Sequence, residues 1–167
     1  METRTPTGIG QIGVGYWGKN LLRNFAALPQ ARVVQVCDQN PDVLARVRQQ
    51  HPGLATTTNY QELLDNPDIE AVVIAVETPW HFPTAEAALR AGKHVFVEKP
   101  LAQTVAQAER LVDLADQQQR HLMVGHLLRY HPAFRYVENL IHSGDLGAVY
   151  YLYSVRVNLG IVRQREN

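Results

Sequence analysis

The sequence lacks several features that would point to particular classes of protein. Its net charge is zero, because 16 Lys and Arg residues balance 16 Asp and Glu residues. A nucleic-acid binder needs a basic surface, and a protein held at an anionic membrane needs a basic cluster. The balanced charge therefore argues against both nucleic acid and membrane as partners. No run approaches the roughly 20 apolar residues of a membrane-spanning helix. Cys37 is the single cysteine, which excludes an internal disulfide. Its apolar neighbours predict a small buried side chain in a reducing compartment.

The motifs of several enzyme classes are also missing. There is no phosphate-binding G-x-x-x-x-G-K motif and no G-x-S-x-G of a serine hydrolase. His126 and His131 lie five positions apart but lack the companion cysteines or glutamate of a zinc site, so we predict no metal. Residues 1–7 are polar and have no signal-peptide layout, which favours a cytoplasmic protein.

The composition is that of a folded domain, with 46% hydrophobic and 19% charged residues. Short apolar runs alternate with helical patterns along the chain. We predict strands at residues 9–14, 32–37, 55–58, 70–76, 94–97 and 121–124, and helices at 17–28, 41–50, 60–64, 83–91 and 104–118. This alternation is typical of an α/β fold, a doubly wound parallel sheet with helices on both faces.

The pattern changes after residue 125. Residues 132–143 predict another helix, and residues 148–158 alternate strictly between two faces. Period-two alternation is typical of a half-buried strand in an antiparallel sheet. We therefore expect a complete α/β domain at residues 8–125, and at residues 126–167 the first helix and strand of a second, truncated α/β domain.

A glycine-rich turn follows the first predicted strand. Residues 13–18 read GVGYWG, a G-x-G-x-x-G between a strand and a helix. In such a motif Gly13 permits the tight turn, Gly15 lets a pyrophosphate approach the backbone, and Gly18 lets the helix pack closely. The helix N-terminus also offers free N–H groups to phosphates. The motif predicts a dinucleotide-binding Rossmann domain, and the alternative is a plain glycine turn.

Asp38 ends the second predicted strand, twenty positions after Gly18. An acid at this spacing accepts hydrogen bonds from the adenosine ribose. A carboxylate repels a 2′-phosphate, and the next residues are Gln39 and Asn40 rather than arginine. We therefore predict NAD, with NADP less favoured. An alternative is that the acid caps the helix that starts at Pro41.

Two further strand ends carry chemically active side chains. His81 follows the fourth long apolar run, where it can reach a cofactor or substrate, or serve only in capping or packing. Glu98, Lys99 and Pro100 follow the fifth. Lys99 can polarise a hydroxyl or carbonyl and act as an acid or base where burial or charge lowers its pKa. The alternative is an exposed Glu–Lys pair of little energetic value.

These residues resemble the Gfo/Idh/MocA oxidoreductases. The similarity runs from residue 9 onward. It is carried by GVGYWGKNLLRNF at 13–25, NPDIEAVVIA at 66–75, AGKHVFVEKPLA at 91–102, and VGH at 124–126 with Arg129, Pro132 and Phe134. The resemblance implies a Rossmann domain followed by a domain with a large, mostly antiparallel sheet. It implies an NAD-dependent oxidoreductase that moves a hydride between nicotinamide and a carbinol. The sequences at 15–20 and 158–160 look most like the branch that acts on nucleotide-linked sugars, so we expect a sugar or nucleotide sugar as substrate.

The resemblance also assigns site residues. Lys99 is the expected catalytic residue, and Glu98 is expected to contact the nicotinamide ribose. His126 and Arg129 are expected near the nicotinamide and the substrate. The full set of expected cofactor-binding residues is Gly13, Gly15, Tyr16, Trp17, Gly18, Asp38, Val76, Pro79, His81 and Glu98.

Two departures from the family pattern stand out. Gln11 occupies a strand position that is usually apolar, and a buried amide there needs partners. The chain stops at residue 167, whereas family members continue for roughly another domain. We therefore expect a fragment that carries the cofactor half of the enzyme. The alternative is a catalytically incomplete NAD-binding or self-association module. Both interpretations predict a homo-oligomer that pairs through the strand at 148–158.

Overall fold

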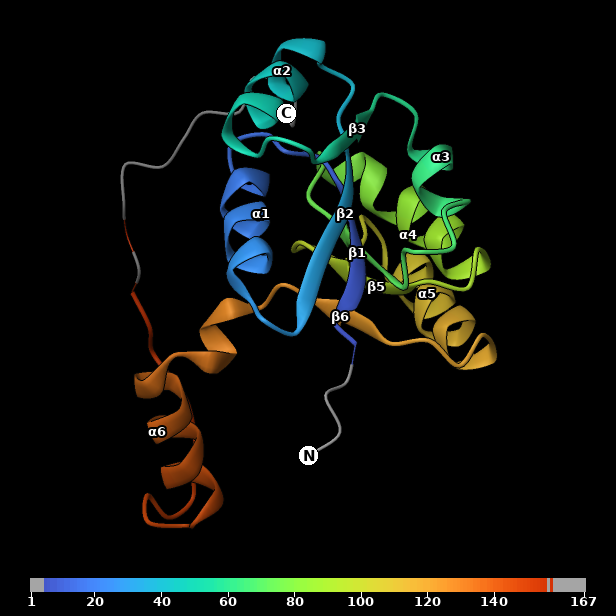
Figure 1. Cartoon of the computed structure of the whole chain (residues 1–167). Coiled ribbons are helices and arrows are strands. Elements are labelled where there is room, and N and C mark those ends of the chain that lie inside the picture. Colours follow the sequence, from blue (N-terminus) through green and yellow to red (C-terminus); the bar gives the residue numbers. More distant parts are fainter. Residues whose placement is uncertain (1–4, 156, 158–167) are drawn as a thin grey trace. The chain divides into compact units, whose positions relative to one another are not determined.

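The computed structural model describes residues 5–155 and 157. Six parallel strands form one sheet in the order β3-β2-β1-β4-β5-β6 (Figure 1). The strands are β1 (Thr7–Ile12), β2 (Ala31–Cys37), β3 (Ala55–Thr57), β4 (Ala71–Ile74), β5 (His94–Val97) and β6 (Leu122–Val124). The strand order reverses between β1 and β4, which is the crevice where ligands bind in doubly wound sheets. The predicted α/β fold with a parallel Rossmann sheet is confirmed.

The helices connect the strands as predicted, with two short additions. They are α1 (Gly18–Ala27), α2 (Pro41–Gln50), α3 (Tyr60–Leu64), η1 (Thr78–Trp80), α4 (His81–Arg90), α5 (Val105–Gln117), η2 (Leu127–Tyr130) and α6 (Pro132–His142). The 3-10 helices η1 and η2 were not predicted. Helix α4 starts at His81, two residues before the predicted Pro83. Proline is tolerated throughout the first turn, because its missing N–H has no partner there.

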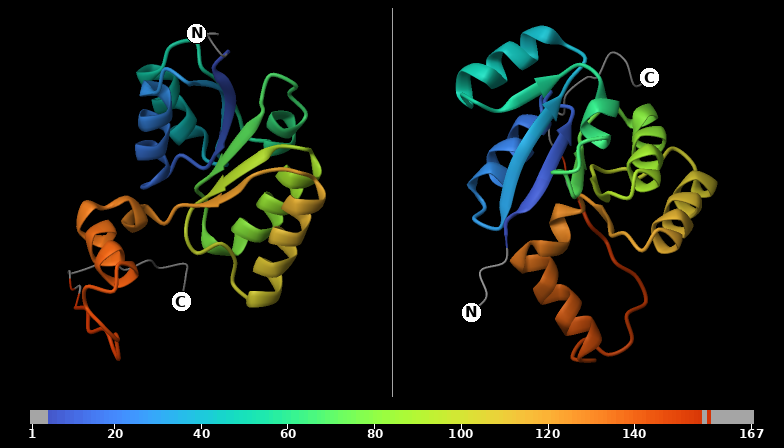
Figure 2. Two further views of the ribbon diagram at one scale, coloured as in Figure 1. Left: turned by 90° about the horizontal axis from the view of Figure 1, so that it is seen from below. Right: turned by 45° about the vertical axis from the view of Figure 1, so that its right-hand side comes forward.

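Apolar side chains cover both faces of the sheet. Figure 2 shows α1 and α2 on one face and α4 and α5 on the other. The smaller cluster, beneath α1 and α2, is built around Val14, Leu22, Val36, Leu44 and Val47. The larger one includes Leu63 and Leu89, both 0% exposed. Truncating such a leucine to alanine costs about 2–5 kcal/mol. Cys37, at 3% exposed, is the small buried side chain that its apolar neighbours predict.

The chain divides into two compact units, Met1–Gly125 and His126–Asn167. None of the described side chains of the second unit is buried. The strand expected at 148–158 is not formed in its described residues, 148–155 and 157. The rest of that expected strand lies outside the described residues. A strand needs a hydrogen-bonded neighbour, and the described part of this unit contains no other strand to provide one.

No helix of the described chain has both the length and the apolar character needed to span a bilayer.

Candidate dinucleotide-binding site

The residues that follow the strands meet at one edge of the sheet, because parallel strands all end on the same side. Backbone hydrogen bonds continue the sheet by one residue beyond several strand ends, and this holds the first loop residues in a row. These bonds join Gly13 N to Cys37 O (2.8 Å), Ala75 N to Ile12 O (2.8 Å), Glu98 N to Ile74 O (2.9 Å) and Gly125 N to Val97 O (2.8 Å). The glycine-rich turn and the Glu98 turn are thereby brought to the same edge.

The three glycines of the motif have different surroundings. Gly13 has φ +89°, and a Cβ at this position would collide with the carbonyl oxygen of Ala75. A Cβ on Gly18 would collide with the carbonyl oxygen of Gly13. Around Gly15, by contrast, no atom of the described residues other than its chain neighbours lies within 4 Å of a Cβ position. The protein itself requires the first and last glycines, whereas the open space at Gly15 fits the close approach of a ligand.

Gln11 holds the glycine turn from beneath. Its side chain is 1% exposed, and its Nε2 donates to the carbonyl oxygens of Gly13 (2.9 Å) and Gly18 (2.8 Å). The two amide hydrogens therefore join the beginning and end of the turn. The Oε1 atom is buried and has no partner in the described part of the chain. The expected need of this amide for partners is met for its donors only.

The first turn of α1 is open to an anion. The helix begins at Gly18 with no side-chain cap and no acidic residue in its first turn. Within the described chain, the amides of Gly15, Tyr16 and Trp17 have no hydrogen-bond acceptor. Lys19 places its Nζ 5.4 Å from the centre of the Tyr16 ring and adds a positive charge beside the turn. Unpaired N–H groups and a nearby cation are what phosphate binding at a helix N-terminus needs.

Asp38 is tied to the glycine turn. Its Oδ2 accepts from the amide of Val14 (2.8 Å) and its Oδ1 from the amide of Asn40 (2.9 Å). Asn40, rather than Asp38, caps α2, because the Asn40 side chain accepts from the amide of Asp42. Each carboxylate oxygen can accept more than one hydrogen bond, so Asp38 retains capacity for two hydroxyl groups.

Glu98 is buried, at 8% exposed, and its carboxylate is held by two donors. Trp17 Nε1 donates to Oε1 (2.7 Å), and the Lys99 amide donates to Oε2 (3.3 Å). The Lys99 side chain is exposed and forms no ion pair within the described residues. The alternative of a surface Glu98–Lys99 pair is therefore not what the structure contains.

His81 is also buried, at 2% exposed. Its Nδ1 lies 2.6 Å from the carbonyl oxygen of Pro100, and its Nε2 lies 3.1 Å from that of Val76. The ring therefore lies between the end of the fourth strand and the Glu98 turn. Val76 is half-buried and Pro79 is exposed in η1. Direct contact of these three residues with a cofactor remains a prediction.

His126 and Arg129 belong to the second unit, and both are exposed. Arg129 lies 3.8 Å from Glu138 within that unit. Their expected position near the nicotinamide and the substrate remains a prediction.

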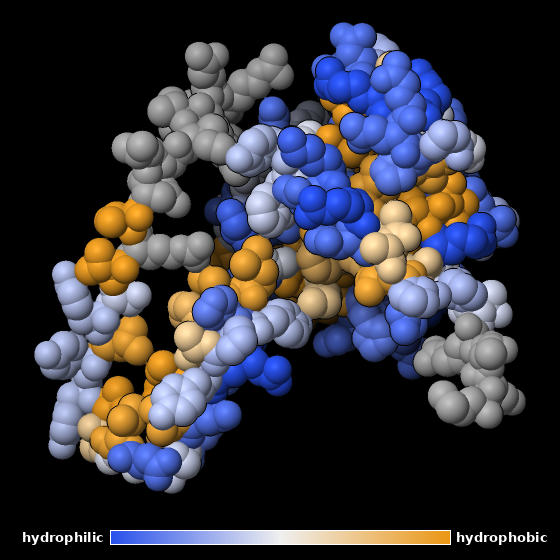
Figure 3. Space-filling view, turned by 60° about the vertical axis from the view of Figure 1, so that its left-hand side comes forward, coloured by the Kyte–Doolittle hydropathy of each residue, from blue (hydrophilic) through white to orange (hydrophobic). Residues whose placement is uncertain are grey.

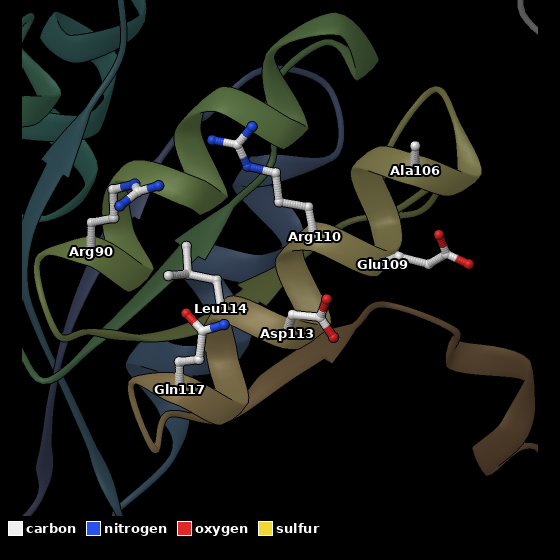
Figure 4. A pocket seen from close by; sticks show the side chains of 7 residues that line it. All are labelled: Arg90, Ala106, Glu109, Arg110, Asp113, Leu114 and Gln117. Carbon is white, nitrogen blue, oxygen red and sulfur yellow. The ribbon is translucent and has the colours of Figure 1, made fainter.

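A hollow of about 470 Å³ lies between α4 and α5, away from the predicted site residues (Figure 4). Arg90 and Arg110 at this hollow both donate to Glu86. Burial opposes ionisation of Glu86, but these hydrogen bonds prevail and lower the pKa of its carboxyl. The lining carries both basic and acidic side chains, Arg90 and Arg110 together with Glu109 and Asp113. Across the described chain, no three His, Cys, Asp or Glu side chains are grouped to hold a metal ion.

Sequence reasoning missed three contributions to this site. An amide in an otherwise apolar strand just before a glycine motif was the available signal for Gln11. No local signal links Trp17 to Glu98, because 81 positions separate them. Gly125 lies beside the Glu98 carboxylate, since a Cβ on it would be 2.9 Å from Glu98 Oε1, and this closeness likewise has no sequence signature.

Comparisons with known proteins agree with this geometry. Residues 7–126 match the GFO_IDH_MocA family model, described as an oxidoreductase family with an NAD-binding Rossmann fold. A curated relative, glycosyl hydrolase family 109 protein 2 of Shewanella sp. (strain ANA-3), is 34% identical over 148 residues, which is 83% of this chain and 32% of the relative. The chain thus spans about a third of the length of this relative.

Solved structures support the same fold. The scyllo-inositol dehydrogenase of Lactobacillus casei with bound NAD(H) and scyllo-inositol is 26% identical, with a TM-score of 0.80 over 86% of this chain and 43% of that one. The 3-ketoreductase KijD10 of Actinomadura kijaniata, in complex with NADP and TDP-benzene, is 30% identical, with a TM-score of 0.77 over 84% of this chain and 43% of that one.

Proposed function

Because the chain belongs to the Gfo/Idh/MocA oxidoreductase family with its NAD-binding Rossmann fold, we propose that it is the dinucleotide-binding part of an NAD-dependent oxidoreductase. The proposed reaction is hydride transfer between nicotinamide and a carbinol carbon of a sugar or nucleotide sugar. The names of two similar proteins, the scyllo-inositol dehydrogenase and the 3-ketoreductase, support this substrate class. The observation that carries the proposal is the glycine turn, bonded to the Asp38 carboxylate through Val14.

The residues at the sheet edge fit a dinucleotide. The free amides of residues 15–17 suit the pyrophosphate, and the space at Gly15 lets it approach. Asp38 suits the hydroxyls of the adenosine ribose, and Glu98 those of the nicotinamide ribose. When bound, the nicotinamide supplies the hydride acceptor or donor. The residues of this chain bind and orient the dinucleotide.

We propose NAD rather than NADP as the preferred cofactor. The Asp38 carboxylate would lie beside a 2′-phosphate and repel it, whereas a 2′-hydroxyl donates to it. Asp38→Asn removes the charge but keeps an oxygen for the Val14 amide. We expect the unaltered chain to bind NADH about tenfold more tightly than NADPH, a ratio that corresponds to 1.4 kcal/mol. The variant should lose most of this preference. Titration calorimetry of the chain with each dinucleotide measures the two affinities.

Asp42→Asn is the matched control, since Asp42 is an exposed acid on the first turn of α2. It should leave the ratio of the two affinities unchanged. If the unaltered chain binds neither dinucleotide, the proposed function fails. If it prefers NADPH, only the role of Asp38 fails.

Lys99 is our proposed catalytic residue. Its exposed side chain directly follows the Glu98 carboxylate. We propose that it positions and polarises the carbinol oxygen once a substrate domain encloses it. In a form of the protein that turns over a sugar, Lys99→Ala should abolish dehydrogenation and leave NADH binding intact. Because the Shewanella relative is named a glycosyl hydrolase, the assay should follow both dinucleotide reduction and glycoside cleavage.

We propose that residues 126–167 begin the substrate and oligomerisation domain. The second unit exposes many large apolar side chains, among them those of Phe134, Val137 and Ile141. Figure 3 shows hydrophobic residues gathered on the surface of this unit. Such a surface is normally covered by further polypeptide or by a second copy. The buried single cysteine agrees with a cytoplasmic location, which we also propose.

A further inference from the structure

The indole of Trp17 reaches across from the glycine turn to the end of the fifth strand. Its Nε1 donates to Glu98 Oε1 over 2.7 Å, although 81 positions separate the two residues. Hydrogen bonds to an ionised acceptor are short and about twice as strong as neutral ones. This bond therefore restrains the Glu98 carboxylate from the side of the glycine turn.

Gly125 restrains the same carboxylate from the end of β6. A Cβ at Gly125 would lie only 2.9 Å from Glu98 Oε1, so a side chain there would have to displace the carboxylate from its position. Gly125 is itself buried and held by a bond from its amide to the carbonyl oxygen of Val97 (2.8 Å). The carboxylate is thus enclosed between the Trp17 indole and the Gly125 backbone.

The hydrogen bonds that the Glu98 carboxylate already makes leave each of its two oxygens able to accept a further hydrogen bond. Trp17 uses one position on Oε1, and the Lys99 amide uses one on Oε2. A carboxylate has about four accepting positions, so one remains on each oxygen. Two accepting positions on neighbouring oxygens match the two neighbouring hydroxyls of a ribose.

We propose that Trp17 and Gly125 are positioning residues that orient the Glu98 carboxylate to bind the vicinal hydroxyls of the second ribose of a dinucleotide. The inference rests on the proposed function, because it assigns a specific part of the cofactor to Glu98. Trp17 then serves the cofactor in two ways. Its side chain acts on the second ribose through Glu98, and its backbone amide acts on the phosphates.

The test compares ADP with ADP-ribose, because only ADP-ribose carries the second ribose. Calorimetric titration of the whole chain with each ligand gives the gain in affinity that this ribose provides. We expect Trp17→Phe to reduce that gain, which is the ratio of the ADP-ribose affinity to the ADP affinity of the same variant, about tenfold, as expected for loss of a hydrogen bond to a charged acceptor. Trp80→Phe is the matched control, since Trp80 is another exposed indole, and it should change neither affinity.

One more variant and a fluorescence measurement keep the test independent of one substitution. Gly125→Ala places a methyl group against Glu98 Oε1 and should reduce the ADP-ribose gain in the same way. In the Trp80→Phe background Trp17 is the single indole, and its fluorescence should respond to ADP-ribose more strongly than to ADP. A role of Trp17 in folding alone would produce no such difference between the two ligands.

The possible failures can be separated. If the unaltered chain binds neither ADP-ribose nor NADH, the proposed function itself is overturned, and the inference with it. If the unaltered chain gains affinity from the second ribose and both Trp17→Phe and Gly125→Ala retain that gain, the inference alone is overturned.

Discussion

Gln11 Nε2 donates to the carbonyl oxygen of Gly18 across 2.8 Å, and thereby joins the buried strand β1 to the first residue of α1. The same nitrogen bonds Gly13. The backbone between these two carbonyls is the segment proposed to bind the pyrophosphate, so Gln11 holds the shape of a site that it does not enter.

Gln11→Met should therefore separate stability from binding. The carbonyl oxygens of Gly13 and Gly18 lose a donor, at about 1–3 kcal/mol each, and removal of the buried unpaired Oε1 returns about 1–3 kcal/mol. We expect the free energy of unfolding in urea to fall by about 1–3 kcal/mol. NADH affinity should fall about fivefold, because the turn loses its restraint. Unchanged affinity would remove Gln11 from the site.

Gln11→Glu is the contrasting variant. It is close to isosteric, but it points carboxylate oxygens at the carbonyls of Gly13 and Gly18. A buried, unpaired charge costs several kcal/mol, and we expect about 3–5 kcal/mol of lost stability. Urea unfolding measures this loss, and a stability equal to that of Gln11→Met would contradict the geometry.

His81 should matter for stability more than for direct ligand contact. His81→Phe fills a similar space but removes the ring N–H that donates to one of the two facing carbonyls, that of Val76 or that of Pro100 according to the tautomer. We expect a loss of about 1–3 kcal/mol, the cost of a buried unpaired acceptor. The exposed His126→Gln is the control and should change stability by less than about 0.5 kcal/mol. Thermal or urea unfolding measures both, and equal stabilities would argue against a bracing role.

His94 predicts acid sensitivity at the start of β5. Burial lowers the pKa of its imidazole from 6.5, and the charges of His121 and Arg120 lower it further, against an opposing effect of Glu70. The unfolded chain therefore binds this proton more readily than the folded chain. The stability contributed by neutral His94 is complete above pH 6.5 and is lost as the pH falls through the lowered pKa.

His94→Asn tests this pH dependence. Asparagine retains an oxygen acceptor where His94 Nδ1 accepts from the amide of His121 at 2.9 Å, but it does not titrate. We expect the plot of unfolding free energy against pH to be flatter for the variant from pH 6.5 downward. Parallel curves for the two proteins would show that other groups cause the acid loss.

Cys37 should be unreactive in the folded chain. Burial, followed by the charges of Asp38 and Glu62, raises the pKa of its thiol from 9.0 to about 11. A shift of about two units makes the reactive thiolate about a hundredfold rarer. Labelling with a disulfide reagent should therefore be at least that much slower in the native protein than in urea. Rapid native labelling would show that β2 opens frequently.

The second unit should associate at high concentration. Phe134, Val137 and Ile141 are exposed at helical spacing along α6. Sedimentation velocity should show a concentration-dependent increase in mass, because burying this apolar face is favourable. The double variant Val137→Glu and Ile141→Glu should shift the chain to the monomer, and the exposed Arg135→Glu should not. A strictly monomeric parent chain would contradict this expectation.

Much of the fold follows from local patterns. The predicted helix at 41–50 and strand at 94–97 match α2 and β5 to the residue. Proline at the first position of α2 and a short apolar run at β5 give local signals for these boundaries. The first strand ends at Ile12 rather than at the predicted residue 14, because Gly13 leaves the extended conformation with φ +89°. The expected strand at 148–158 shows the limit of such patterns, because alternation describes a face but does not supply a partner strand.

The sequence by itself determined the order of strands and helices, the glycine turn, and the placement of Asp38, Glu98 and Lys99 at strand ends. These depend on periodicity and on residue types at short spacing, which are local properties of the chain. Only the tertiary structure decided that Gln11 holds the glycine turn, that Trp17 bonds Glu98, and that His81 lies between two carbonyls. Packing brings these groups together from distant positions, and burial then makes each polar atom depend on the partner that it meets.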